Sequence, residues 1–400
     1  MTTETVTVNK DWLIWARKSV HYDKETVAKK LKIKKERLDE WETTGEISFK
    51  NLRKLSKIYE YPSALFFNLN DPVYEEEMPD FRTMNNKTIP ITPEISFELR
   101  NAKRKREILL DIEEEDEEFI IPEFKYKEYD YNSNEEVIDI ITDILKINNA
   151  KRRHMNLDYW INEVEKLGVL VFQFYNIPPK DLRGYAIYND KLPIIGINHK
   201  ENEKARKFTL FHELAHLFLK KEGLSNFATY QLTNNIEVKC NAIAAEILVP
   251  SKDIDLRIRE KQIQDFTDDK WIKYFANIYK VSNEVIVRKF LNQKHITKKE
   301  YEKYHNRFNE YIFPEQKRRT PSKENKKEDD VADDVLIQRK LEQRKKEAKR
   351  CITENGAYYI TSLITAYNDG VIDNLEFARY IDKPLPMVSL VIQRIKEEGS

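Results

Sequence analysis

The sequence predicts an α+β protein with a helical N-terminal domain, a central domain built around a small sheet, and a helical C-terminal region. Short amphipathic helices separated by polar turns occupy residues 11–67. Three short runs rich in β-branched and aromatic residues follow between residues 168 and 198, and helical patterning then resumes. A chain of 400 residues exceeds one ordinary hydrophobic core, so we expect several domains.

Changes in composition divide the chain. Pro72 and Pro79 interrupt regular structure after the N-terminal domain, and a charged stretch of low hydrophobicity at 315–330 marks a second break. The acidic run at 113–118 is typical of a solvated surface. We predict five segments: an N-terminal domain at 1–70, a connector with a helix and the acidic run at 71–134, a central domain with a helical cap at 135–310, a charged linker and helix at 311–350, and a small helical unit at 351–400.

Composition limits the classes of function. The 69 basic and 69 acidic residues cancel, so any binding of nucleic acid must come from a local patch. Two cysteines, Cys240 and Cys351, cannot form a disulfide framework, and the opening residues lack the apolar core of a signal peptide. No run approaches the roughly 18 apolar residues of a membrane span. We therefore expect a cytoplasmic protein without a membrane partner.

The N-terminal domain has the pattern of a helix-turn-helix. Two of its short helices are joined by a brief turn, and in this motif the second helix enters the DNA major groove. That second helix spans residues 34–41, and Lys34, Lys35 and Arg37 at its start are the predicted contacts to double-stranded DNA. Residues 1–67 hold fourteen Lys and Arg against ten Asp and Glu, an excess of 14 − 10 = 4 positive charges. The alternative interpretation is a helical bundle that contacts another protein.

The stretch "FTLFHELAHLFL" at 208–219 carries the strongest indication of chemistry. On a helix, His212 and His216 share one face because residues four apart stack one turn above the other. Imidazole nitrogens are good zinc ligands, and Glu213 lies beside them, where a general base for a hydrolytic water is needed. The alternative is an ordinary buried helix whose histidines bond to backbone carbonyls.

A catalytic zinc ion needs a third protein ligand. The helix expected over residues 234–249, ended by Pro250, offers candidates. Glu237 is our choice, and Asn241, one turn further on, is a candidate for orienting it. Glu246 points away from that face and is the second choice. Cys240 is a further alternative as a thiolate ligand, although a single cysteine on a helix is more often a small buried hydrophobe.

Three strands are expected before the HExxH helix, in "GVLVFQFY", "LRGYAIY" and "LPIIGIN". The third directly precedes that helix, so we expect its edge to pair with an extended peptide substrate. Asn198 and Arg183 are candidate substrate contacts, with a turn or surface role as the alternative for each. Residues 271–292 have the rhythm of a helix-turn-helix, yet we expect them to cap the central domain.

The motifs "RKFTLFHELAHLFL" and "EVKCNAIAAEILVP" together resemble the ImmA/IrrE family of bacterial zinc endopeptidases. The resemblance implies a zincin-like (gluzincin-type) fold in which His212, His216 and Glu237 hold Zn²⁺, with Mn²⁺ as the alternative ion, and Glu213 is the catalytic glutamate. It also implies cleavage of a protein substrate, commonly a helix-turn-helix repressor, that releases stress or mobile-element genes. At Cys240 this chain departs from the small apolar residue that is frequent in the family.

The segments "WARKS", "VAKKLKI", "RLDEWETTG" and "LRKLSKIYEYPSALFF" resemble the XRE-type, Cro-like helix-turn-helix. DNA binding is therefore implied, and some domains of this type serve as dimerisation modules, which predicts a homodimer through this domain. The combined hypothesis is a DNA-binding zinc endopeptidase. Two alternatives remain open: a transcriptional regulator whose peptidase-like domain acts by binding a partner, and an antitoxin or phage-defence component.

Overall fold

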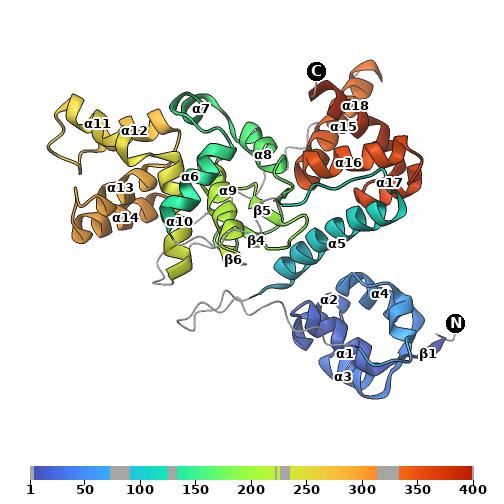
Figure 1. The fold of residues 1–400 in the computed structure, drawn as a ribbon. Helices are drawn as coiled ribbons and strands as arrows, with labels where there is room; N and C mark the ends of the chain where they lie inside the picture. The colour runs from blue at the N-terminus through green and yellow to red at the C-terminus, as the bar shows by residue number, and fades with distance from the viewer. Residues whose placement is uncertain are drawn as a thin grey trace. The chain divides into compact units, whose positions relative to one another are not determined.

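The computed structural model describes residues 4–72, 91–124, 133–220, 223–225, 235–312 and 333–398. The chain divides into two compact units, unit 1 at Met1–Lys105 and unit 2 at Arg106–Ser400 (Figure 1). Most of the described residues are helical and two small sheets accompany them, which is compatible with the predicted α+β class. The predicted linker at 315–330 lies outside the described residues. In the part of the chain that is described, no helix has both the length and the apolar character of a membrane span.

Unit 1 contains the predicted short helices and one pairing of strands that the sequence did not predict. Its elements are β1 (Thr5–Thr7), α1 (Lys10–Ser19), α2 (Lys24–Leu31), α3 (Lys35–Thr44), β2 (Glu46–Ser48), α4 (Phe49–Tyr59), the 3-10 helix η1 (Ser63–Phe67) and the first part of α5 (Pro93–Glu115). β1 and β2 pair antiparallel, so the expectation of a purely helical domain was incomplete. The turn between α2 and α3 is residues 32–34, the length that a helix-turn-helix requires.

Local signals in the sequence explain where α2 and α3 begin and end. The side chain of Asp23 caps α2 by accepting a hydrogen bond from the Thr26 amide at 2.7 Å. Gly45 ends α3 with φ of 74°, and a Cβ there would lie 2.3 Å from a backbone oxygen of β1's neighbour Val8. Inside the unit, the buried Arg17 guanidinium lies 2.6 Å from the Glu42 carboxylate and joins α1 to α3.

Besides the rest of α5, unit 2 holds the remaining elements. They are α6 (Asn134–Ile144), α7 (Asn149–His154), α8 (Leu157–Glu165), β3 (Leu170–Phe174), β4 (Gly184–Ile187), β5 (Ile194–Asn198), α9 (Glu203–Phe218), β6 (Gly223–Ser225), α10 (Asn235–Leu248), α11 (Ser251–Lys261), α12 (Asp269–Tyr279), α13 (Asn283–Asn292), α14 (Lys298–Ile312), α15 (Asp333–Asn355), α16 (Ala357–Asn368), α17 (Asn374–Tyr380), the 3-10 helix η3 (Leu385–Met387) and α18 (Val388–Glu398). The three predicted strands are β3, β4 and β5, and the HExxH stretch lies on α9.

The strands of unit 2 form one sheet in the order β3-β5-β4-β6. β3 pairs parallel with β5, whereas β4 pairs antiparallel with both β5 and β6. The expectation that β5 offers a free edge to a substrate was wrong, because both of its edges are already occupied. Closeness in sequence to α9 did not place β5 at the margin of the sheet; β3 and β6 are the outer strands among those described.

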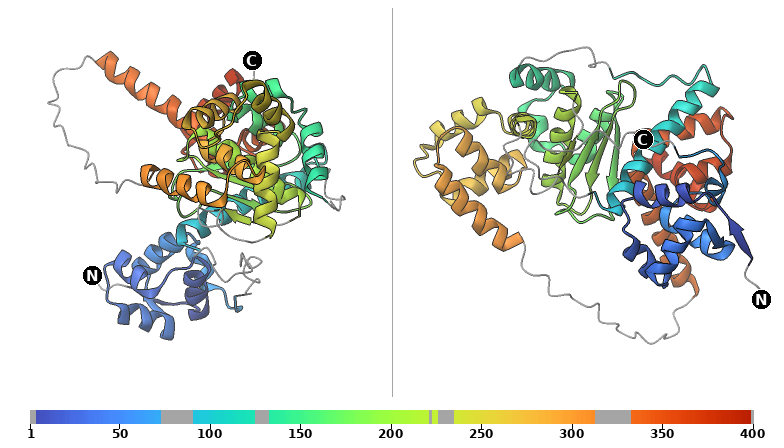
Figure 2. Two further views of the ribbon diagram at one scale, coloured as in Figure 1. Left: turned by 90° about the vertical axis from the view of Figure 1, so that its left-hand side faces the viewer. Right: turned by 90° about the horizontal axis from the view of Figure 1, so that it is seen from below.

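The sheet of unit 2 lies between two groups of helices. The right-hand view of Figure 2 shows it nearly edge-on, with α9 on one side and the C-terminal helices α15–α18 on the other. One apolar core contains Ile195 from β5, Phe211 from α9 and Ile243 from α10. Phe275 of α12 and Phe290 of α13 belong to the same core, in keeping with the cap expected at residues 271–292.

Glu165, at the end of α8, joins β3 to the C-terminal helices. Its carboxylate is 4 % exposed and accepts backbone hydrogen bonds from Val171 on β3 and from Tyr358 on α16, the latter at 3.3 Å. At the same place, a Cβ on Gly356 would lie 2.6 Å from the Val171 carbonyl oxygen, so glycine permits this close approach. Burial raises the pKa of Glu165 from 4.5 to about 8.

Glu165→Gln should therefore change the pH dependence of folding. Because the pKa of Glu165 is higher in the folded state, its contribution to stability is full below about pH 4.5 and is lost as the pH rises through about 8. The glutamine variant, which accepts the same two backbone bonds without a charge, should gain on the order of a few kcal/mol of unfolding free energy over the parent at pH 9 and little at pH 5. Urea denaturation at both pH values measures this. Glu163→Gln, on the same helix, is the matched control and should keep the parent's pH profile of stability. If Glu165→Gln also kept that profile, the Glu165 carboxyl would be ionised in the native state and the prediction would be wrong.

Candidate metal centre

The helix α9 is buried on all sides along its C-terminal part. Asn202 starts the helix by accepting a hydrogen bond from the Ala205 amide at 3.0 Å, and every residue from Lys207 to Phe218 is buried. A helix of this kind is apolar all round in a protein core, so buried polar residues on it need partners. His212, Glu213 and His216 are the buried polar groups of this stretch that lie at the candidate site.

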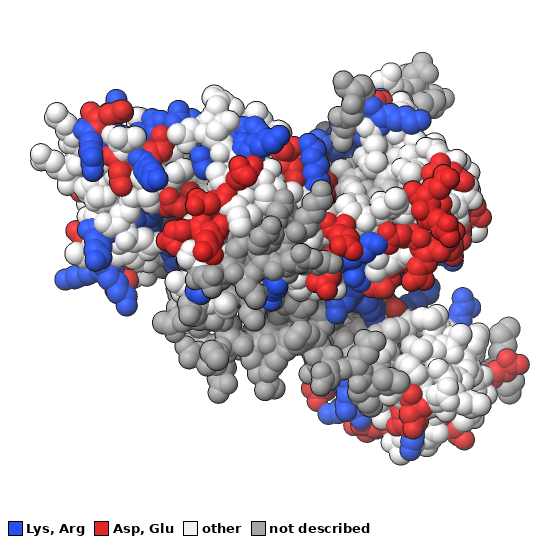
Figure 3. All heavy atoms as spheres, in the orientation of Figure 1, with Lys and Arg blue, Asp and Glu red and all other residues white. Residues whose placement is uncertain are grey.

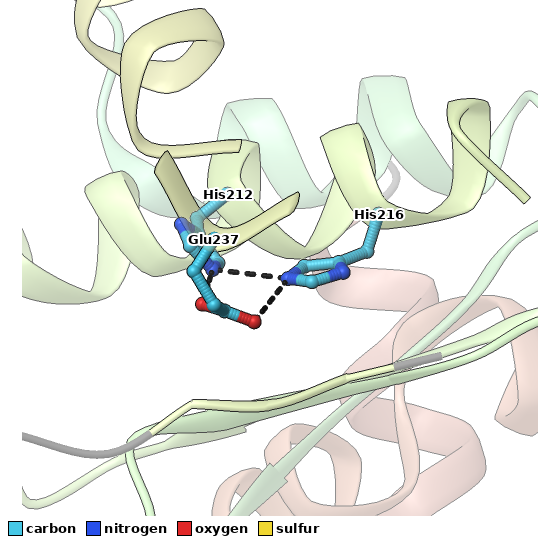
Figure 4. A group of neighbouring side chains, drawn as sticks. All are labelled: His212, His216 and Glu237. Atoms are coloured by element: carbon cyan, nitrogen blue, oxygen red, sulfur yellow. Dashed lines mark hydrogen bonds and ion pairs between the residues drawn. The ribbon is translucent and has the colours of Figure 1, made fainter. Parts of the chain in front are cut away.

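Three side chains converge where α9 meets α10. His212 Nε2 and His216 Nε2 are 3.2 Å apart, and the Glu237 carboxylate oxygens lie 3.3 Å from the first and 3.2 Å from the second (Figure 4). The ligand atoms of these three residues all lie within 4.8 Å of one another. The structure thus brings together the three residues that the sequence singled out as metal ligands.

The spacing of these atoms fits a metal ion. A tetrahedral zinc ion bound at about 2.0–2.1 Å holds its ligand atoms about 3.3–3.4 Å apart, close to the separations of 3.2 and 3.3 Å observed here. Two imidazoles and a carboxylate are also a donor set found at catalytic zinc sites, where a fourth position stays open for water or substrate. On distance and on chemistry, the residues present fit zinc.

Electrostatics at the centre favour a cation between the three side chains. Burial alone would raise the pKa of Glu237, but His212 and His216 outweigh that effect and lower it. Burial opposes the charging of His216, whereas Cys240 and Glu237 raise its pKa well above the usual value. Electron-rich atoms this close together need a positive charge among them, which a proton or a metal ion can supply.

Glu213 follows the candidate ligand His212 in the chain and lies against the sheet. It is 0 % exposed, and a Cβ on Gly184 of β4 would lie only 2.8 Å from its Oε1 atom. The same added carbon would lie 2.4 Å from the Thr209 methyl group. Gly184 therefore lets β4 approach α9 where Glu213 stands. Sequence reasoning missed this residue, although a glycine inside a strand is a known sign of close backbone approach.

The other candidates on α10 occupy different surroundings. Asn241 is buried, and its Oδ1 atom accepts no hydrogen bond from the described residues. Cys240 is fully buried beside His216, and burial raises the pKa of its thiol, as expected of a small apolar residue rather than a thiolate ligand. The Glu246 carboxylate accepts a hydrogen bond from the Ser251 amide at 2.7 Å and pairs with Lys289, so it does not join the three ligands.

The two candidate substrate contacts have partners within the protein. Asn198 is fully buried, and its amide donates hydrogen bonds to the carbonyl oxygens of Ile177 at 2.9 Å and Leu182 at 2.7 Å. This geometry favours the turn role, because the side chain holds the loop before β4. Arg183 Nε lies 3.1 Å from the Glu201 carboxylate, at the start of β4 and close to Gly184.

In unit 1, the predicted DNA contacts lie at the start of α3. Lys34 precedes the first turn, Lys35 Nζ lies 2.8 Å from Glu25, and Arg37 pairs with Glu40 at 2.5 Å. Exposed pairs of this kind are weak and exchange readily for other anions. α3 itself holds four acidic residues and two basic ones, so its net charge is 2 − 4 = −2.

In contrast to the net negative charge of α3, basic side chains gather around the start of α4. A concave surface of about 380 Å³ lies beside α3, and Arg37, Lys50 and Lys54 supply basic groups to it. On the face of unit 2 drawn in Figure 3, by contrast, basic and acidic side chains are interspersed on the left-hand part and acidic side chains gather on the right-hand part. Any contact of unit 1 with nucleic acid therefore depends on this local group of basic residues.

The segment that contains the three candidate ligands on α9 and α10 is similar to a known protein family. Residues 164–291 match the IrrE N-terminal-like domain of the Peptidase_M78 family. The matched segment is about a third of the chain and contains the three candidate ligands, Glu213 and Gly184. It supports a metallopeptidase of the ImmA/IrrE type, a family that implies a metal ion. Among curated proteins, none matches the chain.

Proposed function

We propose that this protein is a zinc-dependent endopeptidase that cleaves a helix-turn-helix transcriptional repressor, and that unit 1 binds double-stranded DNA. The observation that carries the peptidase is the convergence of His212, His216 and Glu237 at 3.2–3.3 Å with Glu213 beside them. A protein that only bound a partner would have no need of all four groups at one buried point. The five-segment division, a zincin-like fold and a cytoplasmic location are parts of this proposal.

His212, His216 and Glu237 would hold the ion, and their burial fixes their orientation. When bound, zinc supplies Lewis acidity, which polarises the peptide carbonyl and makes a water molecule more acidic. Glu213 is then the general base: its carboxylate accepts a proton from the attacking water and returns it to the leaving amine. The buried surroundings of Glu213, with Gly184 at its side, keep the carboxylate in one position.

The peptide substrate would lie along the outer edge of β6. Of the two outer strands described, β3 has its free edge engaged by Glu165 and Gly356 near Val171. β6 pairs with β4 through Tyr185 and Leu224, and β4 approaches Glu213 at Gly184. A strand added beside β6 would gain main-chain hydrogen bonds without depending on the sequence of the peptide.

Co-expression with helix-turn-helix repressors from the same genome, one at a time, tests the proposed reaction. An immunoblot should show the repressor shortened in cells that make the protein and intact in cells that lack it. Mass spectrometry of the fragments then gives the cleaved bond. A repressor that stays at full length while its target genes are induced would remove cleavage from the proposal.

DNA binding by unit 1 rests on the α2–turn–α3 arrangement and on the basic concave surface beside it. Lys34 and Lys35 stand at the start of α3, and Arg37, Lys50 and Lys54 line the concave surface. Phosphate contacts from such residues position a helix on the duplex, while base contacts determine the sequence read. Because α3 is net acidic, we expect phosphate contacts to contribute most of the affinity.

The triple variant Lys34→Ala, Lys35→Ala, Arg37→Ala should weaken DNA binding and reduce its dependence on salt. Each lost phosphate contact lowers counterion release, so the slope of log affinity against log salt should fall by about 0.9 per contact. Fluorescence anisotropy over a salt series measures both effects, and cleavage of a short peptide should persist. The control replaces Lys10, Lys18 and Lys103, three exposed lysines of unit 1 on helices other than α2, α3 and α4. Equal affinities of the triple variant and the parent would show that α3 is not the recognition helix.

A further inference from the structure

A cavity of about 50 Å³ lies between α9, α10, α13 and the start of β4. Its apolar walls come from Ala205 and Phe208 of α9, Ala245 of α10 and Val285 of α13. All of its lining residues fall within the segment that matches the peptidase family. None of the three candidate metal ligands lines this cavity, nor does Glu213.

Three of the residues that line the cavity lie near the candidate metal centre. The Phe208 ring, one turn before His212, lies 6.3 Å from that histidine's ring. Arg183 directly precedes Gly184, the residue against which Glu213 packs. Ala245 stands one turn after Asn241 on α10. If a side chain of a peptide substrate entered the cavity, the backbone of that peptide would therefore pass close to the zinc ligands.

The charged residues of the cavity already have partners. Arg183 lies 3.1 Å from Glu201. Arg288 Nη2 donates to the Tyr301 hydroxyl at 3.1 Å, and that hydroxyl lies 3.4 Å from the Glu284 carboxylate. A charged side chain of a substrate would have to disrupt one of these pairs, whereas an apolar one would leave both intact. The lining thus selects an uncharged group.

The volume of the cavity also limits which uncharged side chains can enter it. A water molecule needs about 10–15 Å³ of such space and a cavity of about 150 Å³ holds benzene, so a cavity of about 50 Å³ suits a small aliphatic group better than an aromatic ring. The side chains of valine, leucine and isoleucine have three or four heavy atoms. Phenylalanine, with seven, exceeds the space, and glycine or alanine would leave most of it empty.

We propose that this cavity is the specificity pocket of the peptidase and receives an aliphatic side chain, valine, leucine or isoleucine, from a substrate residue that flanks the scissile bond. The inference rests on the proposed peptidase function. It also gives the helical cap a task, because α13 supplies the outer wall through Val285. Filling the pocket anchors the peptide beside the zinc ligands, and the apolar area buried there favours the correct register.

Two variants change the pocket in opposite directions. Val285→Ala widens it and should raise the ratio of kcat/KM for phenylalanine over valine peptides by roughly tenfold, the usual effect of one or two methyl groups. Ala245→Leu narrows it and should reduce cleavage after or before leucine by a similar factor, in favour of alanine. Val287→Ala is the matched control, because it removes the same atoms from the same helix but lies in the apolar core.

The experiment uses the zinc-loaded full chain and a randomised peptide mixture, with mass spectrometry of the new termini. The same mixture is also enriched by binding to the immobilised Glu213→Gln chain, with and without the pocket variants, so that selection is measured without turnover. Metal content and melting temperature verify that each variant is folded. Val285 is only partly buried, so Val285→Ala remains informative if Ala245→Leu does not fold.

Aliphatic selection that shifts with Val285→Ala but not with Val287→Ala supports the pocket. Cleavage by the parent with a preference that no pocket variant alters overturns the pocket and leaves the peptidase intact. A zinc-loaded parent that cleaves no peptide overturns the proposed activity, and the binding measurement then decides the pocket separately: enrichment of aliphatic residues that follows Val285→Ala supports it, and unselective binding overturns it.

Discussion

Glu213→Gln should lower kcat/KM for peptide and repressor substrates by at least about a hundredfold, the scale on which loss of a general base acts. Glutamine keeps the length and shape of the side chain beside Gly184 but cannot accept a proton. Zinc content, melting temperature and DNA binding should stay at the parent's values, because none of the three ligands changes. In cells, the variant should occupy its operator yet fail to induce the repressor's target genes.

The control for this experiment is Glu246→Gln. Glu246 lies on α10 like Glu237, but its carboxylate bonds Ser251 and Lys289 and stands apart from the ligands. Cleavage and metal content should therefore survive this substitution. Normal induction by Glu213→Gln with the repressor intact would falsify the protease mechanism, and the protein would then act by binding a partner, as a regulator or as an antitoxin or phage-defence component.

The three side chains of the candidate metal centre could be singled out from the sequence because their signals are local. His212 and His216 share a helical face through their spacing alone, and Glu237 was chosen by the same argument on a second helix. Only the meeting of α9 with α10 depends on the tertiary fold, and the chemistry of zinc already required a third ligand. The structure places the three ligand atoms 3.2–3.3 Å apart.

The order of the strands could not be predicted in the same way. Apolar runs indicate that β3, β4 and β5 exist, but pairing is decided by contacts between segments distant in sequence. β6 has only three residues, too few for a periodic pattern, yet it takes the outer place beside β4. The expected role of β5 as a substrate edge failed for this reason.

The burial of Glu165 and the existence of the cavity could not be predicted either, because both depend on contacts between segments distant in sequence. A glutamate near the end of an amphipathic helix is normally solvated, and its burial here follows from the docking of α16 more than 190 residues later in the chain. The cavity needs α9, α10, α13 and the start of β4 together, and none of these elements alone signals a pocket. The acidic balance of α3, in contrast, is visible in the sequence.

His216→Ala should remove the metal from the protein. The purified parent should contain close to one zinc or manganese ion per chain, and the variant should retain only a small fraction of it after dialysis, because two donors cannot complete the tetrahedral set. Elemental analysis measures this directly. Peptidase activity should be lost with the ion. The fold should largely survive, since the core of unit 2 extends from α6 to α14 and only one corner depends on the metal.

His154→Ala provides the matched control, because His154 is an exposed histidine of the same unit at the end of α7. Its metal content should equal the parent's. The far-ultraviolet circular dichroism of both variants should match the parent, which separates loss of a ligand from loss of the fold. Full metal content in His216→Ala would place the ion elsewhere. The close approach of His212, His216 and Glu237 would then be an ordinary buried hydrogen-bond cluster, held together by a proton instead of a metal ion.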